Sequence, residues 1–425
     1  MACVQNLDRE YDIALYGATG FVGGLTAAYL AKAAPTDVRI ALAGRSQRKL
    51  EAVRAGLGPA AENWAIVLAD ATDQSSLDAL AASARSIVST VGPYTEHGLP
   101  LVAACAAAGT DYADLTGESL FVRRSIDGYH KQAADTTARI VHSCGFDSVP
   151  SDLSVHALYR RALADDAGEL RETTLVVRRI RGGVSGGTAA SGLAQLREMA
   201  TDPAARRLAV DPYTLSPVRA AEPELGRQSD GSLRRAAGID RSLSGWTAGF
   251  FMGPYNTRIV RRSNAIRDFA YGREFRYSEV MSLGRTPFAL VPAAVLAGGL
   301  TAGVALSPLL RFVPHSLLAR LSPRPGTGPS ERSRAKGFFA IETFATTSSG
   351  RRYRARFAMQ GDPGYAATAV LLGESALALA LDTDRLSRSG GVLTPATAMG
   401  DPLLDRLVRA GVDIQVDELV GAAAR

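Results

Sequence analysis

Cysteine and histidine are scarce in this chain of 425 residues. It has three cysteines and five histidines, with no CxxC pair and no HExxH sequence. A disulfide framework, a structural zinc site and a zinc hydrolase of the HExxH type are therefore not expected, and no metal site is predicted.

Long tracts of like charge are also missing. The net charge is +6, and only four of the 48 basic residues are lysine. Because the arginines are scattered, the chain lacks a basic tail and no nucleic-acid partner is expected. The first twelve residues are polar and charged, without the apolar core of a secretory signal, so a cytoplasmic location is expected.

Long apolar runs are rare, with one exception at residues 286–310, which carry no charge. This length is enough to cross a bilayer. Prolines and small residues dilute its hydropathy, and a spanning helix would split an enzyme domain. Three interpretations stay open: a buried or homodimer-facing helical hairpin, peripheral contact with lipid at the inner face of the membrane, and a membrane span.

The first third of the chain alternates short apolar runs with helical stretches, the pattern of a parallel sheet flanked by helices. Strands are predicted at residues 11–16, 38–43, 65–69, 86–91, 111–115 and 139–143. Helices are predicted at residues 21–33, 46–56, 75–83, 100–108 and 121–138. This alternation predicts an α/β class with an N-terminal doubly wound Rossmann domain over residues 1–148.

The pattern changes beyond Pro150, where a second, α+β domain is predicted over residues 149–360. It would contain a helix, a strand and an antiparallel pair, at residues 151–164, 172–180 and 338–346 with 351–359. Residues 202–245 are rich in Pro, Gly, Ser and charge, and are expected to be mostly loop. A long Ala/Leu helix is predicted at residues 365–381.

A glycine-rich turn lies between the first predicted strand and its helix. Glycine permits a tight turn, close approach of the backbone to a pyrophosphate, and close packing of helix on strand. The helix start offers free N–H groups to phosphates. The turn is therefore predicted to bind a dinucleotide, the alternative being a plain strand-to-helix turn. The residues concerned are Gly17, Ala18, Thr19, Gly20, Phe21, Val22 and Gly23.

The end of the second strand indicates which cofactor binds. NAD enzymes usually carry Asp or Glu about 20 residues beyond the glycines, to hold the ribose 2′-hydroxyl. This chain has Arg45 and Ser46 there. Because a guanidinium can pair with a 2′-phosphate, NADP(H) is predicted as the cofactor; the alternative is that Arg45 is a solvated loop residue.

Two further loops at strand ends are expected to contact the cofactor. Asp70 and Ala71 follow the third strand, where Asp70 could accept a hydrogen bond from the adenine amino group or could cap the helix at Ser75. The fourth strand leads to the nicotinamide side of the sheet. The residues expected there are Thr90, Val91, Gly92 and Pro93.

Four motifs together resemble the saccharopine dehydrogenase-like oxidoreductases. They are GATGFVG, AGR, STVGPY and GFDSVPSD, at residues 17–23, 43–45, 89–94 and 145–152. Shorter segments extend the resemblance nearly from end to end: SGGT, GPSE and GGVLTP, at residues 185–188, 328–331 and 390–395. Length and motifs are most similar to the trans-acting enoyl reductases, which act beside polyketide synthases that make envelope lipids.

The resemblance implies NADPH-dependent reduction of a carbon–carbon double bond in a polyketide or fatty acyl chain. That chain would be bound to an acyl carrier or polyketide synthase. The resemblance also implies that the second domain covers the nicotinamide and that residues 361–425 return to the Rossmann domain as a helix. Two alternatives stay open: a saccharopine-type amino-acid dehydrogenase, and a non-catalytic lipid-associated protein on a Rossmann scaffold.

Three residues near the expected nicotinamide are catalytic candidates. Hydride transfer to an enoyl group leaves an enolate-like oxygen that needs a donor and an α-carbon that needs a proton. Tyr94 follows the turn after the fourth strand, and Ser143 and Asp147 lie at or beyond the sixth. Tyr94 could instead pack in the core, Asp147 and Ser148 could cap the next helix, and water could supply the proton.

Overall fold

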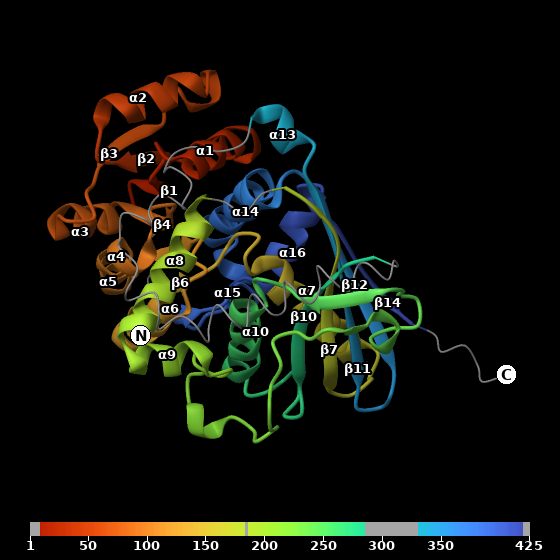
Figure 1. Ribbon diagram of the computed structural model, residues 1–425. Helices are drawn as coiled ribbons and strands as arrows, with labels where there is room; N and C mark the ends of the chain where they lie inside the picture. Colours follow the sequence, from red (N-terminus) through yellow and green to blue (C-terminus); the bar gives the residue numbers. More distant parts are fainter. Residues whose placement is uncertain (1–8, 183–185, 285–329, 420–425) are drawn as a thin grey trace.

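The computed structural model describes residues 9–182, 186–284 and 330–419, which form two sheets of seven strands each (Figure 1). The N-terminal third of the chain, red to orange in Figure 1, supplies most of the first sheet and its helices. The apolar segment 286–310 lies outside the described residues, so its three interpretations stay predictions.

The first sheet is parallel, in the order β13-β6-β5-β4-β1-β2-β3. Its strands are β1 (Tyr11–Tyr16), β2 (Ile40–Gly44), β3 (Ala65–Leu68), β4 (Ala84–Ser89), β5 (Asp111–Asp114), β6 (Arg139–Val141) and β13 (Gly391–Leu393). The helices of this part are α1 (Phe21–Ala33), α2 (Gln47–Gly56), α3 (Gln74–Ser83), α4 (Tyr94–His97), α5 (Leu99–Ala108) and α6 (Ser119–Thr136). The predicted doubly wound α/β fold is confirmed by the Rossmann order 3-2-1-4-5-6 of its first six strands.

Strand β1 lies at the centre of this sheet. Ile13 and Leu15 are fully buried, because helices cover both faces of a doubly wound sheet. Ala14 pairs with Ala41 of β2 on one side and with Ile87 of β4 on the other. The strand order reverses between β1 and β4, so a dinucleotide is expected at the carboxyl ends of these two strands.

Two strands of this sheet end two residues earlier than predicted, and one strand was missed. β4 and β6 end at Ser89 and Val141, not at residues 91 and 143. Ser143 has a φ of 66°, a left-handed conformation that cannot continue a strand. The missed strand, β13, pairs with β6, and it is too short for an apolar pattern to reveal it.

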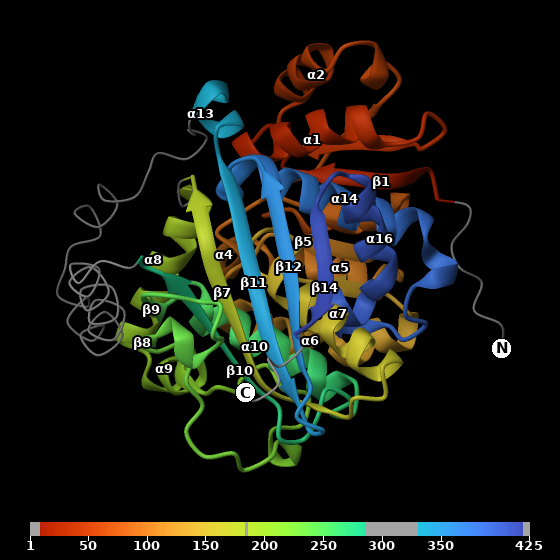
Figure 2. The same cartoon turned by 90° about the vertical axis from the view of Figure 1, so that its right-hand side faces the viewer.

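The second sheet has the order β14-β12-β11-β7-β10-β9-β8. Only its neighbours β7 and β10 are parallel. Its strands are β7 (Leu170–Arg181), β8 (Arg234–Arg235), β9 (Trp246–Gly249), β10 (Arg276–Ser282), β11 (Phe338–Thr347), β12 (Arg352–Gln360) and β14 (Asp413–Glu418). The pairing of β11 with β12 confirms the predicted antiparallel pair. Figure 2 shows β7, β11, β12 and β14 side by side, with helices behind them.

The helices of the remaining chain are α7 (Val149–Ala164), α8 (Gly186–Thr201), α9 (Pro203–Val210), α10 (Gly253–Ile266), α13 (Glu331–Ala335), the π-helical turn η6 (Pro363–Ala367), α14 (Thr368–Leu381), α15 (Pro395–Ala398) and α16 (Gly400–Arg409). Residues 202–245 are mostly loop, as expected, but they include the short helix α9, which is capped by the side chain of Asp202. Helix α10 was missed because it buries Arg258, Arg261 and Arg262, which hide the apolar period of a helix.

The C-terminal part of the chain joins both sheets. α14 packs on β1, β4, β5 and α1, and a β-carbon at Gly373 would lie 2.4 Å from Tyr29 Cδ1 of α1. β14 then pairs with β12. Among the described residues, one helical stretch, Pro363–Leu381, has the length and apolar composition of a helix that could cross a membrane. Most of this stretch is buried inside the fold, as in the core helix of a globular domain.

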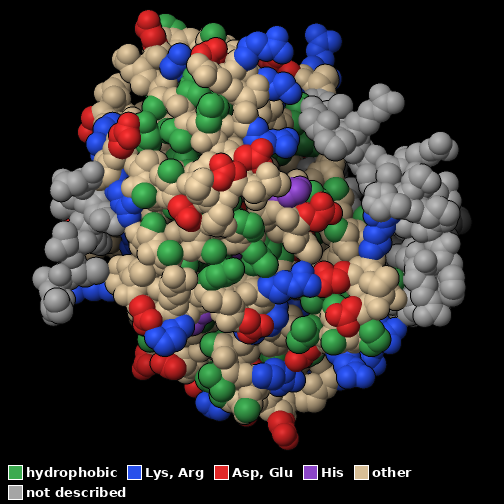
Figure 3. All heavy atoms as spheres, turned by 90° about the vertical axis from the view of Figure 1, so that its left-hand side faces the viewer, with side chains coloured by type: hydrophobic (Ala, Val, Ile, Leu, Met, Phe, Trp, Pro, Cys, Tyr) green, Lys and Arg blue, Asp and Glu red, His purple; other side chains and the backbone are tan. Residues whose placement is uncertain are grey.

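The surface at the left of Figure 1 mixes basic and acidic side chains, with no broad region of one sign (Figure 3). Apolar side chains lie singly or in small groups between them. Small scattered apolar groups are ordinary on protein surfaces and need no partner to explain them.

Candidate functional site

The glycine turn between β1 and α1 has the shape that a diphosphate site needs. Gly17 has a φ of 89°, a conformation that favours glycine. A β-carbon at Gly17 would lie 2.7 Å from Thr90 Oγ1, and one at Gly23 would lie 2.1 Å from the carbonyl oxygen of Gly17. Both positions therefore exclude a side chain. Within the turn, Ala18 is buried and Thr19 is exposed.

The first turn of α1 leaves backbone amides open. Gly20 precedes the helix without capping it, and the first turn holds no acidic residue. The Gly24 amide donates to the Gly20 carbonyl oxygen at 2.8 Å, so the amides of Phe21, Val22 and Gly23 have no acceptor within the helix. These amides, at the positive end of the helix dipole, can hold a diphosphate.

Arg45 follows β2 and lies close to Asp70 and Tyr16. Burial and Asp70 raise the pKa of Tyr16 to about 12, while Arg45 and the amide of Ala71 act in the opposite direction. Arg45 is exposed and makes no hydrogen bond or ion pair with any residue that the structure describes. Its guanidinium is therefore available to a phosphate, and Ser46 follows it at the start of α2.

Asp70 does not cap α3. Its carboxylate accepts hydrogen bonds from Thr72 N at 2.9 Å and Thr72 Oγ1 at 2.8 Å, which hold the pKa of Asp70 below its usual value. The helix is capped instead by Asp73, which accepts from Ser75 N at 3.1 Å. The capping interpretation of Asp70 was therefore wrong, and its adenine contact stays a prediction.

The loop after β4 lies beside the glycine turn. The Thr90 amide donates to the Tyr16 carbonyl oxygen at 2.9 Å, and Thr90 Oγ1 donates to the Gly17 carbonyl oxygen at 3.1 Å. Residues 91–93 follow and are partly or fully exposed. The structure thus brings the two predicted cofactor loops together at the ends of β1 and β4.

Glu118, fully buried before α6, fixes the continuation of this loop. Its carboxylate accepts hydrogen bonds from Tyr94 N at 3.0 Å and Thr95 N at 2.8 Å. It also accepts from Ser191 Oγ of α8 at 2.5 Å. One carboxylate therefore joins the loop expected at the nicotinamide to a helix that lies beyond the Rossmann domain in sequence.

The Tyr94 hydroxyl is engaged by two backbone groups. It donates to the Ser89 carbonyl oxygen at 3.0 Å and accepts from the Leu115 amide at 3.1 Å. The side chain is buried, and burial raises its pKa well above the ordinary value. These bonds join the ends of β4 and β5, and the catalytic role of Tyr94 stays a prediction.

We expect Tyr94→Phe to lower the free energy of unfolding by about 1–3 kcal/mol, because the partly buried amide of Leu115 loses its acceptor. Turnover by the folded variant should stay close to that of the parent. Urea unfolding and steady-state kinetics measure the two effects. Lost turnover with unchanged stability would instead favour Tyr94 as the proton donor.

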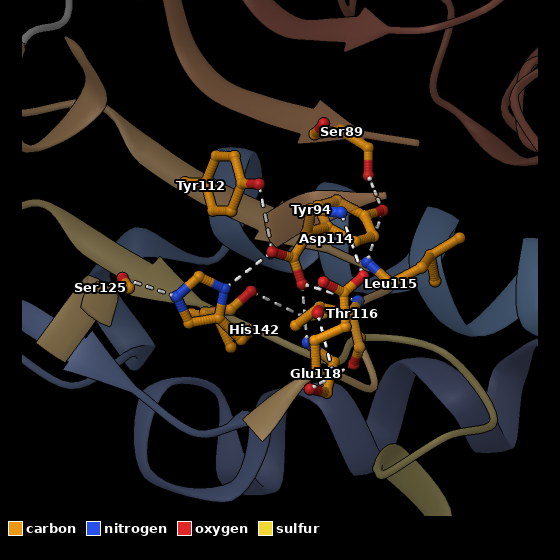
Figure 4. Close-up of polar contacts among 12 residues, drawn as sticks. Ser89, Tyr94, Tyr112, Asp114, Leu115, Thr116, Glu118, Ser125 and His142 are labelled. Carbon is orange, nitrogen blue, oxygen red and sulfur yellow. Dashed lines mark hydrogen bonds and ion pairs between the residues drawn. The ribbon is translucent and has the colours of Figure 1, made fainter. Parts of the chain in front are cut away.

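Asp114, at the end of β5, is the centre of a buried polar network (Figure 4). Its Oδ1 accepts from Thr116 N at 3.1 Å and Ser143 N at 2.9 Å. Its Oδ2 accepts from the Tyr112 hydroxyl at 3.1 Å and contacts His142 Nδ1 at 2.7 Å. The network holds the end of β6 against the end of β5.

The Ser143 hydroxyl is also engaged. It donates to the Thr116 carbonyl oxygen at 2.8 Å and therefore accepts from the Tyr255 hydroxyl of α10. Burial raises the pKa of Tyr255 well above its ordinary value. Because the Ser143 proton has an internal acceptor, a catalytic role would require this bond to open, and that role stays a prediction.

Asp147 differs from the other two candidates. It is partly buried, and its carboxylate is hydrogen-bonded only by its own amide within the described part of the chain. Burial, together with nearby Asp114, raises its pKa to about 7. The charge of Asp147 contributes to the raised pKa of Tyr94 and of Tyr255. The structure therefore brings the catalytic candidates Asp147 and Tyr94 close together. A carboxyl group with this pKa can give up a proton near neutral pH.

The GFDSVPSD segment also connects distant parts of the chain. Ser148 occupies the N-cap position of α7, as the capping interpretation expected, but its Oγ donates to Asn256 Oδ1 at 3.0 Å and makes no capping hydrogen bond. Asp152 accepts from Ser263 Oγ at 2.5 Å and from the Ala396 amide at 2.8 Å. The segment therefore ties α7 to α10 and to the C-terminal helix α15.

Asp114, Glu118 and Tyr255 were not predicted as site residues. Asp114 and Glu118 lie at and just beyond the carboxyl end of β5, and that position in a doubly wound sheet was the available indication. Tyr255 lies in α10, where no motif marks it, and only the tertiary fold brings it to Ser143.

Comparisons with known proteins agree with this geometry. Residues 13–141 match the family model described as the saccharopine dehydrogenase NADP-binding domain. A provisionally named trans-acting enoyl reductase of Mycobacterium tuberculosis is 61% identical over 97% of this chain and 98% of its own. The trans-acting enoyl reductase of Mycobacterium ulcerans is 55% identical over 98% of this chain and 100% of its own.

A solved structure supports the same fold. Apo saccharopine dehydrogenase (L-Glu forming) from Saccharomyces cerevisiae superimposes with a TM-score of 0.56 and 14% identity, covering 96% of this chain and 99% of that one. At this identity the likeness concerns the fold alone. The sequence matches decide the family: the chain belongs to the saccharopine dehydrogenase-like oxidoreductases, among relatives named trans-acting enoyl reductases.

Proposed function

We propose that this protein is an NADPH-dependent enoyl reductase acting on an acyl or polyketide chain carried by a separate synthase or carrier. The relatives in Mycobacterium ulcerans and Mycobacterium bovis bear the name trans-acting enoyl reductase. The structural observation that carries the proposal is Asp147, a partly buried carboxyl with a pKa of about 7 close to the loops of the predicted cofactor site.

Different residues of this chain would bind the cofactor, donate the proton and position the loop at the nicotinamide. When bound, NADPH would supply a hydride to the β-carbon of the double bond. The open amides of Phe21, Val22 and Gly23 would hold its diphosphate. Asp147 in its neutral form would deliver a proton to the α-carbon and become a carboxylate. Glu118 would keep the loop at the nicotinamide in place through the amides of residues 94 and 95.

The preference for NADPH over NADH would depend on Arg45. We expect Arg45→Ala to raise the Kd of NADPH by about tenfold to a hundredfold, because one charge-assisted contact to the 2′-phosphate is lost. The Kd of NADH should not change. Lys32→Ala removes the same charge from the far end of α1 and serves as the control. Equal weakening of both cofactors by Arg45→Ala would contradict this role.

The reaction itself is tested by NADPH consumption with an enoyl thioester on a carrier protein, with the saturated product identified by mass spectrometry. Equimolar loss of NADPH and gain of product supports the proposal. NADP⁺ reduction driven by lysine or glutamate would favour a saccharopine-type dehydrogenase. Tight lipid binding without cofactor affinity would favour a non-catalytic scaffold. We also propose a cytoplasmic place of action, tested by cell fractionation.

A further inference from the structure

The N-terminus of α1 is contacted by residues from the far end of the chain. The Phe21 ring packs edge-on against Tyr365 of η6, with the ring centroids 5.0 Å apart. The guanidinium carbon of Arg334, in α13, lies 5.2 Å from the centroid of the same Phe21 ring. Figures 1 and 2 both show α13 beside the start of α1. Two segments beyond residue 329 therefore contact Phe21, the first residue of α1 after the glycine turn.

The backbone holds Arg334 in this place. The amides of Gly337 and Asp362 both donate to the Arg334 carbonyl oxygen, at 3.0 and 3.1 Å. Gly361 in turn donates to the Gly337 carbonyl oxygen at 2.8 Å. These bonds fasten α13 to the start of η6, so the position of the guanidinium on Phe21 follows from the fold of the second domain.

The start of α8 approaches the same place. The Gly186 amide donates to the Tyr365 hydroxyl at 3.2 Å, and the first turn of α8, like that of α1, contains no acidic residue. The glycine turn is also where the NADP-binding family model matches.

We propose that Arg334 is a second-domain ligand of the cofactor diphosphate, placed over the glycine turn by its contact with Phe21. The inference depends on the proposed function, because it assigns a further contact to the same cofactor. Phe21 would offer its backbone amide to the diphosphate and its ring to the guanidinium. The diphosphate would then lie between Arg334 of the second domain and the glycine turn of the Rossmann domain. Cofactor binding would therefore depend on the two domains lying against each other.

The test compares Arg334→Ala with Arg332→Ala, which removes the same charge from an exposed position of α13. We expect Arg334→Ala to raise the Kd of NADPH by about tenfold to a hundredfold, measured by calorimetry, through the loss of a charge-assisted contact. Arg334→Lys should recover part of the affinity. Arg332→Ala should bind NADPH as the parent does.

Adenosine 2′-phosphate separates this inference from the proposed function, because it lacks the diphosphate but keeps the phosphate expected at Arg45. Its affinity should be unchanged by Arg334→Ala and weakened by Arg45→Ala. If the parent binds NADPH and Arg334→Ala binds it equally well, the inference is overturned while the proposed function survives. It is also overturned if Arg334→Ala instead raises only the KM of a phosphopantetheine thioester relative to the pantetheine thioester without phosphate.

Discussion

Gly23→Ala is expected to raise the Kd of NADPH at least about a hundredfold, the loss of two or more hydrogen bonds to a charged group. Its β-carbon would lie 2.1 Å from the carbonyl oxygen of Gly17 and 2.9 Å from the carbonyl carbon. Both atoms belong to the backbone, so neither can rotate away. The start of α1 must move off the turn, and the open amides of Phe21 and Val22 move with it.

Gly24→Ala is the matched control, one residue further along the same helix. Its β-carbon would meet nothing closer than Ala18 O at 3.8 Å, and alanine favours a helix over glycine by about 1 kcal/mol. This variant should bind NADPH as the parent does and unfold at a slightly higher temperature. Calorimetry gives the affinities, and circular dichroism verifies that both variants fold. A folded Gly23→Ala protein with parental affinity would contradict the diphosphate assignment.

The Rossmann half of the fold could be predicted because its elements are local. The apolar run of β1, the glycine turn and the start of α1 are consecutive in sequence, so each predicts the next. The amides of Phe21 to Gly23 and the exposed Arg45 lie where that pattern places them. Their contact with NADPH remains a prediction, but their juxtaposition in the fold follows from the sequence.

The second half could not be predicted in the same way, because its site contacts are made at long range. Tyr255 reaches Ser143 from α10, a helix whose buried arginines conceal its period. Ser191 reaches Glu118 from a helix with a glycine-rich start. Such pairs have no spacing that a sequence reveals, since only the packing of α8 and α10 on the Rossmann domain creates them.

Asp147 shows how strongly burial can change the acidity of a carboxyl group. Its usual pKa of 3.8 is raised to about 7 chiefly by desolvation, with a smaller contribution from Asp114. The hydroxyls of Tyr94 and Ser143 donate to carbonyl oxygens, whereas the Asp147 carboxyl makes no such bond to another described residue. Of the three candidates, it is the one that holds a transferable proton near neutral pH without breaking an internal bond.

Asp147→Asn is therefore expected to lower kcat by about a hundredfold or more, the usual contribution of a general acid. For the parent, kcat/KM should fall about tenfold per pH unit above pH 7, because the carboxyl must be protonated to act. The variant should lack this decline, because asparagine does not titrate. Asp135→Asn, at an exposed position of α6, should retain the activity and the profile of the parent.

The pH dependence of stability distinguishes proton donation by Asp147 from a purely structural role of this residue. Between pH 3.8 and about 7 the unfolded chain ionises Asp147 while the folded chain keeps it neutral. Folding therefore loses free energy as the pH rises through this window, and the loss is complete above pH 7. Asp147→Asn lacks that loss, because asparagine does not ionise. The free energy of unfolding of the variant minus that of the parent should therefore increase from pH 5 to pH 8, and denaturant titrations at each pH would measure it. A variant that is inactive and also increasingly unstable at pH 8 would show that Asp147 supports the fold and donates no proton.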